Sequence, residues 1–546
     1  MRSTQERAAS RPLSSIDARA PEAERRSFAP TLRSVWQVAT AAIIVVVHVA
    51  MLAAVIVAGS SLRLWELDAL GFNSDEAVYA GQAAAIAADP DLKEIFPIFR
   101  AHPLLFQSVL AVGHAAGIEG TAARPIAAVT GMLAVGVVFL LGRLLYGNRA
   151  AMLAALFMAV MPYHVLVSRQ ILLDGPMTLF ATLALYLVAR FARSGDAAWL
   201  YAAGGALGLT FLAKETGIVL LGAVYAFLAL SPEIRVRLRD LAISFLVMAA
   251  VIAPFPLSLM LAGGGGTSRA GSYLVWQLFR PANHDWGFYP TVALPAIGLA
   301  LVAVAVLGIV LVRRSIGWRE RLLVGWIVVP FAFFQLWPVK GFQYLLPLAA
   351  PIAVLAAVTV TNVLPRTIWA SVARPWVRTA LLPAALGATM AILLGLTSWS
   401  RIQVAVSGEY LAGSGGVPGG REAGLWVRDN VPDGATLMTI GPSMANIIQY
   451  YGLLPAYGLS VSPNPQQRNP SYQPISNPDL AIRAGDIQYL VWDSFSAARS
   501  SHFSERLHDY VRRYHGRVVH TETITALTPS GEPAAVPVVI IYEVRP

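Results

Sequence analysis

Long apolar runs recur along most of the chain, from Val45 to Leu396. A helix needs about 20 mostly apolar residues to cross a bilayer, and runs of 17 to 25 residues are typical. The pattern predicts a polytopic α-helical membrane protein. The eleven predicted spans lie near 36–59, 124–142, 150–167, 175–193, 198–213, 216–230, 240–261, 291–312, 322–338, 343–363 and 379–399.

Segment 102–118 is apolar as well, but it is short and contains two histidines. If it does not cross and the N-terminus is cytoplasmic, each predicted cytoplasmic loop carries two to four arginines, as the positive-inside rule requires. These loops are 143–149, 190–196, 231–240, 313–321 and 364–378. We therefore expect 102–118 to lie in the outer interface as an amphipathic segment, within an outer loop 61–122. The odd number of spans then places the C-terminus outside.

The two ends of the chain differ from the apolar region, which we take as a transmembrane domain over 36–400. Residues 1–35 are polar with seven arginines and predict a disordered cytoplasmic tail, followed by a first span that stays as a signal anchor. A Gly-rich linker over 401–420 leads to an extracytoplasmic α/β domain over 421–546. In that domain we expect a loop at 463–478, strands at 436–440, 487–492, 518–522 and 536–543, and helices at 421–429 and 503–514.

Composition agrees with a membrane protein and excludes several other classes. The chain of 546 residues is 56% hydrophobic and only 13% charged, whereas a soluble domain is about a quarter charged. There is no cysteine, which excludes disulfides, thiolate zinc sites and a cysteine nucleophile. The net charge of +10 does not predict nucleic-acid binding, since much of the positive charge falls in the loops assigned to the cytoplasm. We expect a multi-pass protein of the plasma membrane, with the lipid bilayer as a partner.

Lysine is rare, which makes its positions informative. The chain has only Lys93, Lys214 and Lys340, and the last two fall at the outer ends of predicted spans. A lysine there can simply extend its head group to the interface. Ionisable groups at membrane depth are, however, usually functional, and both lysines stand beside other polar residues. We therefore take Lys214, with its neighbour Glu215, and Lys340 as candidates for binding substrate or phosphate.

Acidic residues gather in the predicted outer loops. Asp75 and Glu76 open a predicted helix, where Asn73 as the cap and Glu76 as its reciprocal partner would be a sufficient structural reason for them. The functional alternative is a general base presented at the outer face. Arg169 and Asp174 are either an interfacial ion pair or a site pair, in which the arginine binds an anionic group.

Two further features of the outer loops carry less weight. His102 is more often structural than functional in such a position. Loop 263–290 holds basic and aromatic residues that suit a phosphate and a sugar, and equally an aromatic belt.

Several segments, in this order, resemble the polytopic glycosyltransferases of the GT-C superfamily. They are similar in pattern to the protein O-mannosyltransferases and the lipid A aminoarabinose transferases. The resemblance covers roughly residues 36–363. It rests on FNSDEAVYAG, HPLLF, RPIAAVTGMLAVGVVFLLGRLLYG, SRQILLDGPMTLF, GLTFLAKETG and KGFQYLLPLAAP.

The resemblance implies a GT-C fold and a sugar donor linked to polyprenyl phosphate, with inverting transfer to an acceptor outside. Asp75 matches the acid taken as catalytic base, Glu76 follows it, and Asp174 matches the acid after the third span. Lys340 and Tyr344 match a lysine–tyrosine pattern near the lipid phosphate. His102 matches the His-Pro of the mannosyltransferases, which favours a mannosyltransferase-like enzyme.

The chemistry is coherent with these residues. Displacing phosphate from an anomeric carbon needs a base on the acceptor hydroxyl and fixed cations on the leaving phosphate. Asp75 suits the first part, and Lys340, Lys214 and Arg169 suit the second. We predict no metal or other cofactor, although an outer loop with two carboxylates could hold a divalent cation. The competing hypothesis is a transporter or flippase of a lipid-linked sugar. Polar residues that map to one outer cavity would favour the enzyme, whereas a pore lined on both sides would favour transport.

Overall fold

The computed structural model describes residues 32–99, 102–261, 273, 275–277, 279–403, 417–527 and 532–545. The chain divides into two compact units, residues 1–51 and 52–546. In the first unit the described part is helical from Leu32, where α1 (Leu32–Leu64) begins. The predicted tail over 1–35 therefore lies almost wholly outside the described residues. Everything below concerns residues 52–546.

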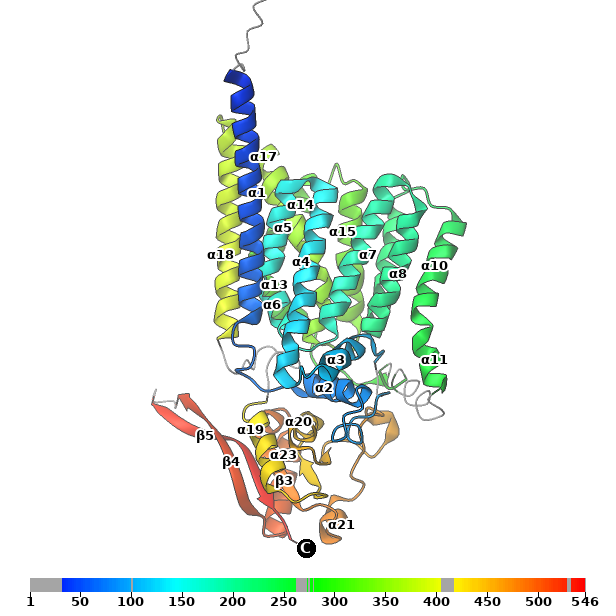
Figure 1. Ribbon diagram of the computed structural model, residues 1–546, viewed down its shortest axis with the longest axis vertical. Helices are drawn as coiled ribbons and strands as arrows, with labels where there is room; N and C mark the ends of the chain where they lie inside the picture. Colours follow the sequence, from blue (N-terminus) through cyan, green and yellow to red (C-terminus); the bar gives the residue numbers. More distant parts are fainter. Residues whose placement is uncertain are drawn as a thin grey trace, which may run out of the picture. The chain divides into compact units, whose positions relative to one another are not determined.

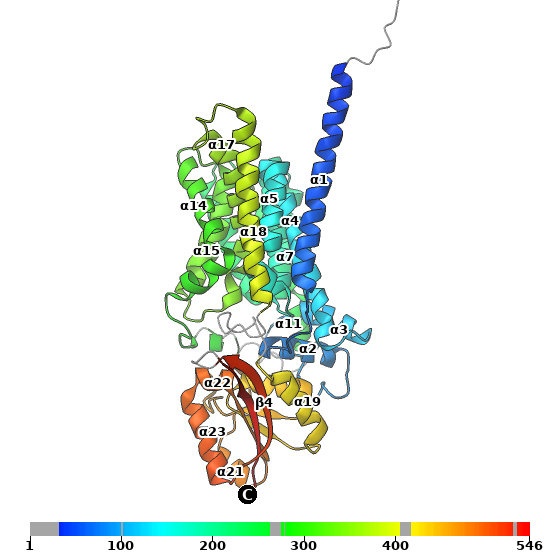
Figure 2. The ribbon, with the colours of Figure 1, turned by 90° about the vertical axis from the view of Figure 1, so that its left-hand side faces the viewer.

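The apolar region forms a bundle of helices (Figures 1 and 2). Helix α16 is buried along its whole length and packs against α5, α14 and α15, so this run is apolar on every side because protein surrounds it. The helices of this region are α4 (Arg124–Tyr146), α5 (Asn148–Val160), α6 (Pro162–Ser168), α7 (Asp174–Ser194), α8 (Ala197–Ala213), α9 (Val219–Leu230), α10 (Leu238–Ile252), α11 (Pro254–Leu261), α13 (Leu294–Ile297), α14 (Leu299–Val312), α15 (Trp318–Leu336), α16 (Ala349–Val358), α17 (Leu364–Arg366) and α18 (Leu382–Ile402).

Short 3₁₀ or π segments continue several of these helices. They are η1 (Gly120–Ala123), η2 (Glu215–Ile218), η3 (Tyr289–Ala293), η4 (Phe342–Leu348), η5 (Thr359–Val363) and η6 (Val377–Leu381).

Two of the predicted spans are bent. The run near 150–167 breaks between α5 and α6 with a bend of 57°, where Met161 takes an extended conformation before Pro162. A proline disfavours the helical conformation of the residue before it. The run near 291–312 bends by 89° at Gly298, whose φ of 106° lies in a region that glycine adopts without steric cost. The pattern of apolar residues predicted one span at each place and gave no sign of the bends.

The helical content of the apolar region is confirmed, and its number of crossings stays a prediction. By length and composition, five helices among the described residues could cross a membrane, or up to seven if each bent pair is one span. All eleven predicted spans are helical over most of their length, but several are shorter than that measure requires.

The outer loop between α1 and α4 holds two helices, α2 (Ser74–Ile86) and α3 (Leu105–Ala115), which pack against each other. The predicted interfacial segment 102–118 is thus largely the short helix α3. Phe96 is fully buried and lies so close to Gly81 that a Cβ at this glycine would overlap its ring. This contact fixes the loop after α2 onto the helix.

The C-terminal region is the expected α/β domain. A five-stranded sheet has the order β2-β1-β3-β5-β4, in which β1 pairs in parallel with β2 and β3, and β5 pairs antiparallel with β3 and β4. The four predicted strands are confirmed as β1 (Leu437–Thr439), β3 (Tyr489–Asp493), β4 (Arg517–Leu527) and β5 (Pro533–Glu543). The two predicted helices are α19 (Gly420–Asn430) and α23 (Ser501–Arg513). The sequence analysis missed β2 (Ala456–Gly458), α20 (Pro442–Gly452), α21 (Pro478–Arg483) and α22 (Ser494–Arg499).

Both faces of this sheet are covered, because side chains alternate between the faces of a strand. Leu437 and Val491 belong to the same core cluster as Ile447 of α20, whereas Met438 and Leu490 cluster with Leu507 of α23, among others. Within the predicted loop 463–478 the one helical turn is η7 (Pro465–Gln467). Residues 404–416 of the predicted linker lie outside the described residues.

The α/β domain is hydrogen-bonded to the outer loop through α20. The Asn446 side chain donates to the Ser74 hydroxyl at 2.9 Å, and the Tyr451 hydroxyl accepts from the Phe72 amide at 2.9 Å. Arg421 also contacts the Asp68 carboxylate at 3.1 Å. The first two contacts flank Asn73, so the domain reaches the residues that start α2.

Candidate active site

A cavity of about 720 Å³ opens where the start of α2 meets the α/β domain. Its wall combines segments that are far apart in the sequence. Asp75 and Tyr79 come from α2, residues 214–216 follow α8, residues 339–344 follow α15, and residues 460–472 contribute from the α/β domain. These are mainly the places where helices end and polar backbone and side chains become available.

Asp75 stands at the start of α2 with its carboxylate on the cavity. Asn73 caps the helix by accepting from the amides of Asp75 and Glu76, and Glu76 completes the capping box, as the sequence predicts. Asp75 is half-buried and lines the cavity. Within the described part of the chain its carboxylate forms no hydrogen bond and no ion pair. It is therefore held in place by its backbone and available to a ligand.

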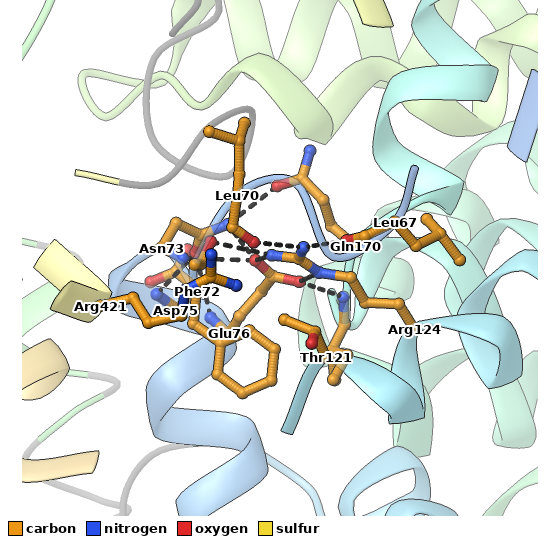
Figure 3. A network of polar contacts seen from close by, with 12 residues as sticks. Leu67, Leu70, Phe72, Asn73, Asp75, Glu76, Thr121, Arg124, Gln170 and Arg421 are labelled. Atoms are coloured by element: carbon orange, nitrogen blue, oxygen red, sulfur yellow. Dashed lines mark hydrogen bonds and ion pairs between the residues drawn. The ribbon is translucent and has the colours of Figure 1, made fainter. Parts of the chain in front are cut away.

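Glu76 has the opposite surroundings (Figure 3). Its carboxylate accepts from Arg124 Nε at 2.8 Å and from the second Arg124 guanidinium nitrogen at 2.7 Å. It also accepts from the Ile171 amide at 3.0 Å. Arg124 in turn donates to the carbonyls of Leu70 and Gly71. Glu76 is 1% exposed and does not line the cavity, so the geometry gives it a structural part in holding the start of α2.

Asp174 and Lys214 form a buried pair behind the cavity wall. Lys214 Nζ lies 2.9 Å and 2.8 Å from the two carboxylate oxygens of Asp174, and 4.9 Å from the centre of the Tyr344 ring. Lys214 and Tyr344 line the cavity, whereas Asp174 does not. The structure thus brings together three candidates from distant segments, with the acid supporting the cation.

His102 and Glu215 form a second pair, directly on the cavity wall. His102 Nδ1 lies 2.8 Å from Glu215 Oε2, and both residues line the cavity. The rings of Tyr79 and Tyr273 meet His102 edge-on. Burial, with a smaller contribution from the Asp75 charge, raises the pKa of Tyr79 well above its usual value. Tyr79 therefore remains a neutral hydroxyl on this wall.

Hydrogen bonds to its backbone hold Lys340 in position. Its amide donates to Asn283 Oδ1 at 2.7 Å and its carbonyl accepts from Asn283 Nδ2 at 2.8 Å. Lys340 Nζ donates to the Trp337 carbonyl at 3.1 Å, which leaves the ammonium with further protons to donate. Gln343 also lines the cavity, and its side-chain carbonyl is buried without a hydrogen-bond partner in the described structure.

Arg169 lies outside this group. It donates to the carbonyls of Leu62 at 2.8 Å and Trp65 at 2.7 Å, and it does not line the cavity. Its contacts are those of a residue that fixes the end of α1. The expectation that Arg169 contacts an anionic ligand finds no support in this geometry.

Sequence reasoning missed part of the cavity wall. Arg280 and His284 of loop 263–290 line it, and so do Arg468 and Arg499 of the α/β domain. The basic and aromatic composition of loop 263–290 was the available signal for the first two. No pattern in the sequence connects the α/β domain to this wall. Among the described residues there is no group of three histidine or acidic side chains that could hold a metal. That the protein needs no metal or other cofactor stays a prediction.

Comparison with known proteins identifies the fold. Over 90% of this chain, the structure matches that of ArnT from Cupriavidus metallidurans bound to undecaprenyl phosphate, with a TM-score of 0.61, 16% identity and 97% of that chain covered. It also matches the archaeal oligosaccharyltransferase AglB from Archaeoglobus fulgidus in complex with an inhibitory peptide and a dolichol-phosphate. That match has a TM-score of 0.54 and 16% identity, and covers 90% of this chain and 74% of the other. The chain has the GT-C fold.

A sequence match agrees with this GT-C fold. Residues 101–259 match the family described as dolichyl-phosphate-mannose-protein mannosyltransferase. That range includes His102, Asp174, Lys214 and Glu215, but neither Asp75 nor Lys340. No curated protein matches the chain.

Proposed function

We propose that this GT-C protein is an inverting glycosyltransferase, which moves a sugar from a polyprenyl-phosphate donor to an acceptor at the outer face of the membrane. One observation carries the proposal. A single cavity joins the Asp75 carboxylate, which has no partner among the described residues, to a set of cations, Lys214, Arg280, Lys340, Arg468 and Arg499. A base and an anion site in one cavity are the two parts that this displacement requires.

In the proposed reaction the acceptor hydroxyl attacks the anomeric carbon of the donor sugar. Its proton passes to Asp75 as the new carbon–oxygen bond forms. The bond from the anomeric carbon to the phosphate oxygen breaks on the opposite face, and its electron pair leaves with the polyprenyl phosphate. Attack and departure on opposite faces invert the anomeric centre. Negative charge grows on the phosphate, where the positions of Lys340 and Arg280 suit its stabilisation.

The remaining candidates receive supporting parts in this scheme. Asp174 orients Lys214, and Tyr344 covers the same ammonium with its ring. His102 and Glu215 hold each other on the wall and offer hydrogen bonds to the sugar. Glu76 positions Asp75 through the capping box rather than reacting itself.

The fold supports the class of donor. ArnT was solved with undecaprenyl phosphate and AglB with a dolichol-phosphate, and we extend a polyprenyl-phosphate donor to this chain by analogy. The match to mannosyltransferases favours mannose among the sugars. The arginine distribution in the loops supports a cytoplasmic N-terminus, with the cavity and the α/β domain outside.

A transporter of the lipid-linked sugar is the weaker alternative. The candidate residues that face a cavity gather in one place, together with residues of the α/β domain. A transporter needs a polar path that opens to both sides of the membrane. One cavity at the helix ends suits an enzyme that works at a surface.

The proposal is tested by sugar transfer in proteoliposomes that hold the full chain. Labelled undecaprenyl-phosphate mannose and other undecaprenyl-phosphate sugars are offered with a membrane extract as the source of acceptor. We expect label to move into an acceptor with the wild type and not with Asp75→Asn. Asp91→Asn is the matched control, because Asp91 is an exposed acid of the same outer loop. Transfer that is equal in the wild type and Asp75→Asn, or absent with every donor, would overturn the proposal.

A further inference from the structure

A second cavity of about 410 Å³ lies beside the first one, between the outer loop and the α/β domain. One wall is residues 94–99 of the outer loop, with Ile95, Pro97 and Phe99. The other wall comes from α20, β2 and residues 470–473. Pro442, Val461 and Tyr472 line both cavities, so the two spaces share a wall.

The two cavities differ in charge. The first is lined by five lysines and arginines, which suits a phosphate. Among the described residues that line the second, Glu94 is the one with a formal charge at neutral pH. The rest of its polar lining is made of neutral groups, such as Asn446, Gln449, Tyr457 and Gln473. Among the described lining residues an anionic ligand would meet no cation, and it would be repelled by Glu94.

The lining of the second cavity combines neutral hydrogen-bonding groups with apolar side chains, and both suit a sugar. Amide and hydroxyl side chains both donate and accept hydrogen bonds, as sugar hydroxyls do. The apolar side chains Ile95, Pro97 and Phe99 face the same space, and they can cover the less polar face of a sugar ring. Specific pockets of a few hundred Å³ combine apolar walls with a few placed polar groups in this way.

The walls are fixed without any ligand. Buried Phe96 anchors the outer loop on α2 at Gly81, and Gln82 donates to the Ile98 carbonyl at 2.8 Å. On the opposite wall, Gln449 donates to the Ala456 carbonyl at 2.8 Å and so joins α20 to β2. A site formed in advance loses less conformational entropy on binding.

The second cavity is also connected to the proposed base. Asn446 lines the second cavity, and its amide donates to Ser74, the residue next to Asp75, at 2.9 Å. Ser74 lines the first cavity. A ligand in the second cavity thus lies next to the end of α2 that carries Asp75.

We propose that the second cavity binds the acceptor, and that this acceptor is an uncharged glycan. The proposal rests on the proposed glycosyltransferase function and gives its acceptor a place and a chemical class. The donor phosphate occupies the first, charged cavity. The glycan occupies the second, neutral cavity and extends past the residues that line both cavities. Its terminal hydroxyl then reaches the carboxylate of Asp75.

The test is direct binding to the full chain in nanodiscs, with one set of probes for each cavity. Undecaprenyl phosphate probes the first cavity, and mannotetraose and cellotetraose probe the second. We expect at least one tetrasaccharide to bind saturably, and Gln473→Ala and Tyr457→Ala each to weaken it about tenfold. Gln473 lies in an exposed loop, so this variant keeps the test valid if Tyr457→Ala does not fold. Lys340→Ala should leave tetrasaccharide binding unchanged and weaken undecaprenyl phosphate.

Several results would overturn the glycan site. They are no binding of either tetrasaccharide, binding that is insensitive to both variants of the second cavity, and binding of a Ser/Thr-rich peptide in place of the sugars. A failure of the proposed function looks different. In that case undecaprenyl phosphate binding is indifferent to Lys340→Ala, while the tetrasaccharide still depends on Gln473 and Tyr457.

Discussion

Asp75 and Glu76 are neighbours in the sequence, yet they belong to two different regions of the molecule. Glu76 lies in a closed network in which Arg124, the Ile171 amide and the Asn73 amide use up its carboxylate (Figure 3). Asp75 faces the cavity and has no partner among the described residues. Successive residues of a helix point about 100° apart, so adjacent acids readily meet different surroundings. Of these two acids, the paired one stabilises the structure, and the one without a partner among the described residues remains available for chemistry.

The largest expected effect is on the rate of transfer in Asp75→Asn. Removal of a general base costs about 10²–10⁴-fold in rate. We expect kcat to fall by that factor, while the affinity for undecaprenyl phosphate and the thermal unfolding temperature stay near those of the wild type. Steady-state transfer measures the rate, and a thermal melt of the purified protein measures the unfolding temperature. A parallel loss of rate and folded yield would place Asp75 with Glu76 as a structural residue.

The stability of the protein should fall when the network around Glu76 is broken. Arg124→Met leaves the Glu76 carboxylate buried without its cation, which typically costs about 3–5 kcal/mol. We expect a lower unfolding temperature and a lower yield of folded protein, with activity per folded molecule less affected than in Asp75→Asn.

The double variant Arg124→Met/Glu76→Gln is the control for this prediction. It removes the buried charge and should recover part of the lost stability. No recovery would mean that the loss comes from the carbonyl contacts of Arg124 rather than from the ion pair.

The next prediction concerns ligand binding by Lys340, a cation that lines the cavity. Hydrogen bonds to a charged group contribute about 1.5–3 kcal/mol, so Lys340→Ala should weaken undecaprenyl phosphate by about 10- to 100-fold. The unfolding temperature of Lys340→Ala should stay near that of the wild type. Lys93→Ala is the matched control, because Lys93 is exposed and does not line the cavity. Equal binding by both variants would remove Lys340 from the phosphate site.

The smallest effect concerns a third acid, Asp493 of β3, which is buried with only one carboxylate oxygen bonded in the described structure. Burial raises its pKa to about 6. Since the folded state holds this proton more tightly than the unfolded state, the stability of the α/β domain should fall as the pH rises from about 4 to 6. The slope is at most about 1.4 kcal/mol per pH unit.

Hydrogen exchange of the amides in β3 and α22 measures this dependence locally. Asp493→Asn should flatten it over that interval. An unchanged pH dependence in Asp493→Asn would assign the effect to another group.

The helical bundle, the α/β domain and most of the candidate residues could be predicted from the sequence. Apolar runs are local signals, and so are alternating strands and a capping residue such as Asn73, because each follows from a few neighbouring residues. The short strand β2 and the helices α21 and α22 were missed because they are brief and lie among turn residues, and α20 was missed although it is as long as α19. The bends at Met161 and Gly298 were missed because a count of apolar residues carries no direction.

Which candidates share a cavity became visible only in the three-dimensional structure. Glu76 pairs with Arg124, Arg169 contacts the end of α1, and Arg499 of the α/β domain lines the cavity. These contacts join residues that are tens to hundreds of positions apart in the sequence. Long-range packing sets such contacts, and one sequence holds no local trace of it. The sequence therefore offered two adjacent acids as catalytic candidates, with Asp75 as the base. Packing closed Glu76 into an ion pair and left Asp75 open to the cavity.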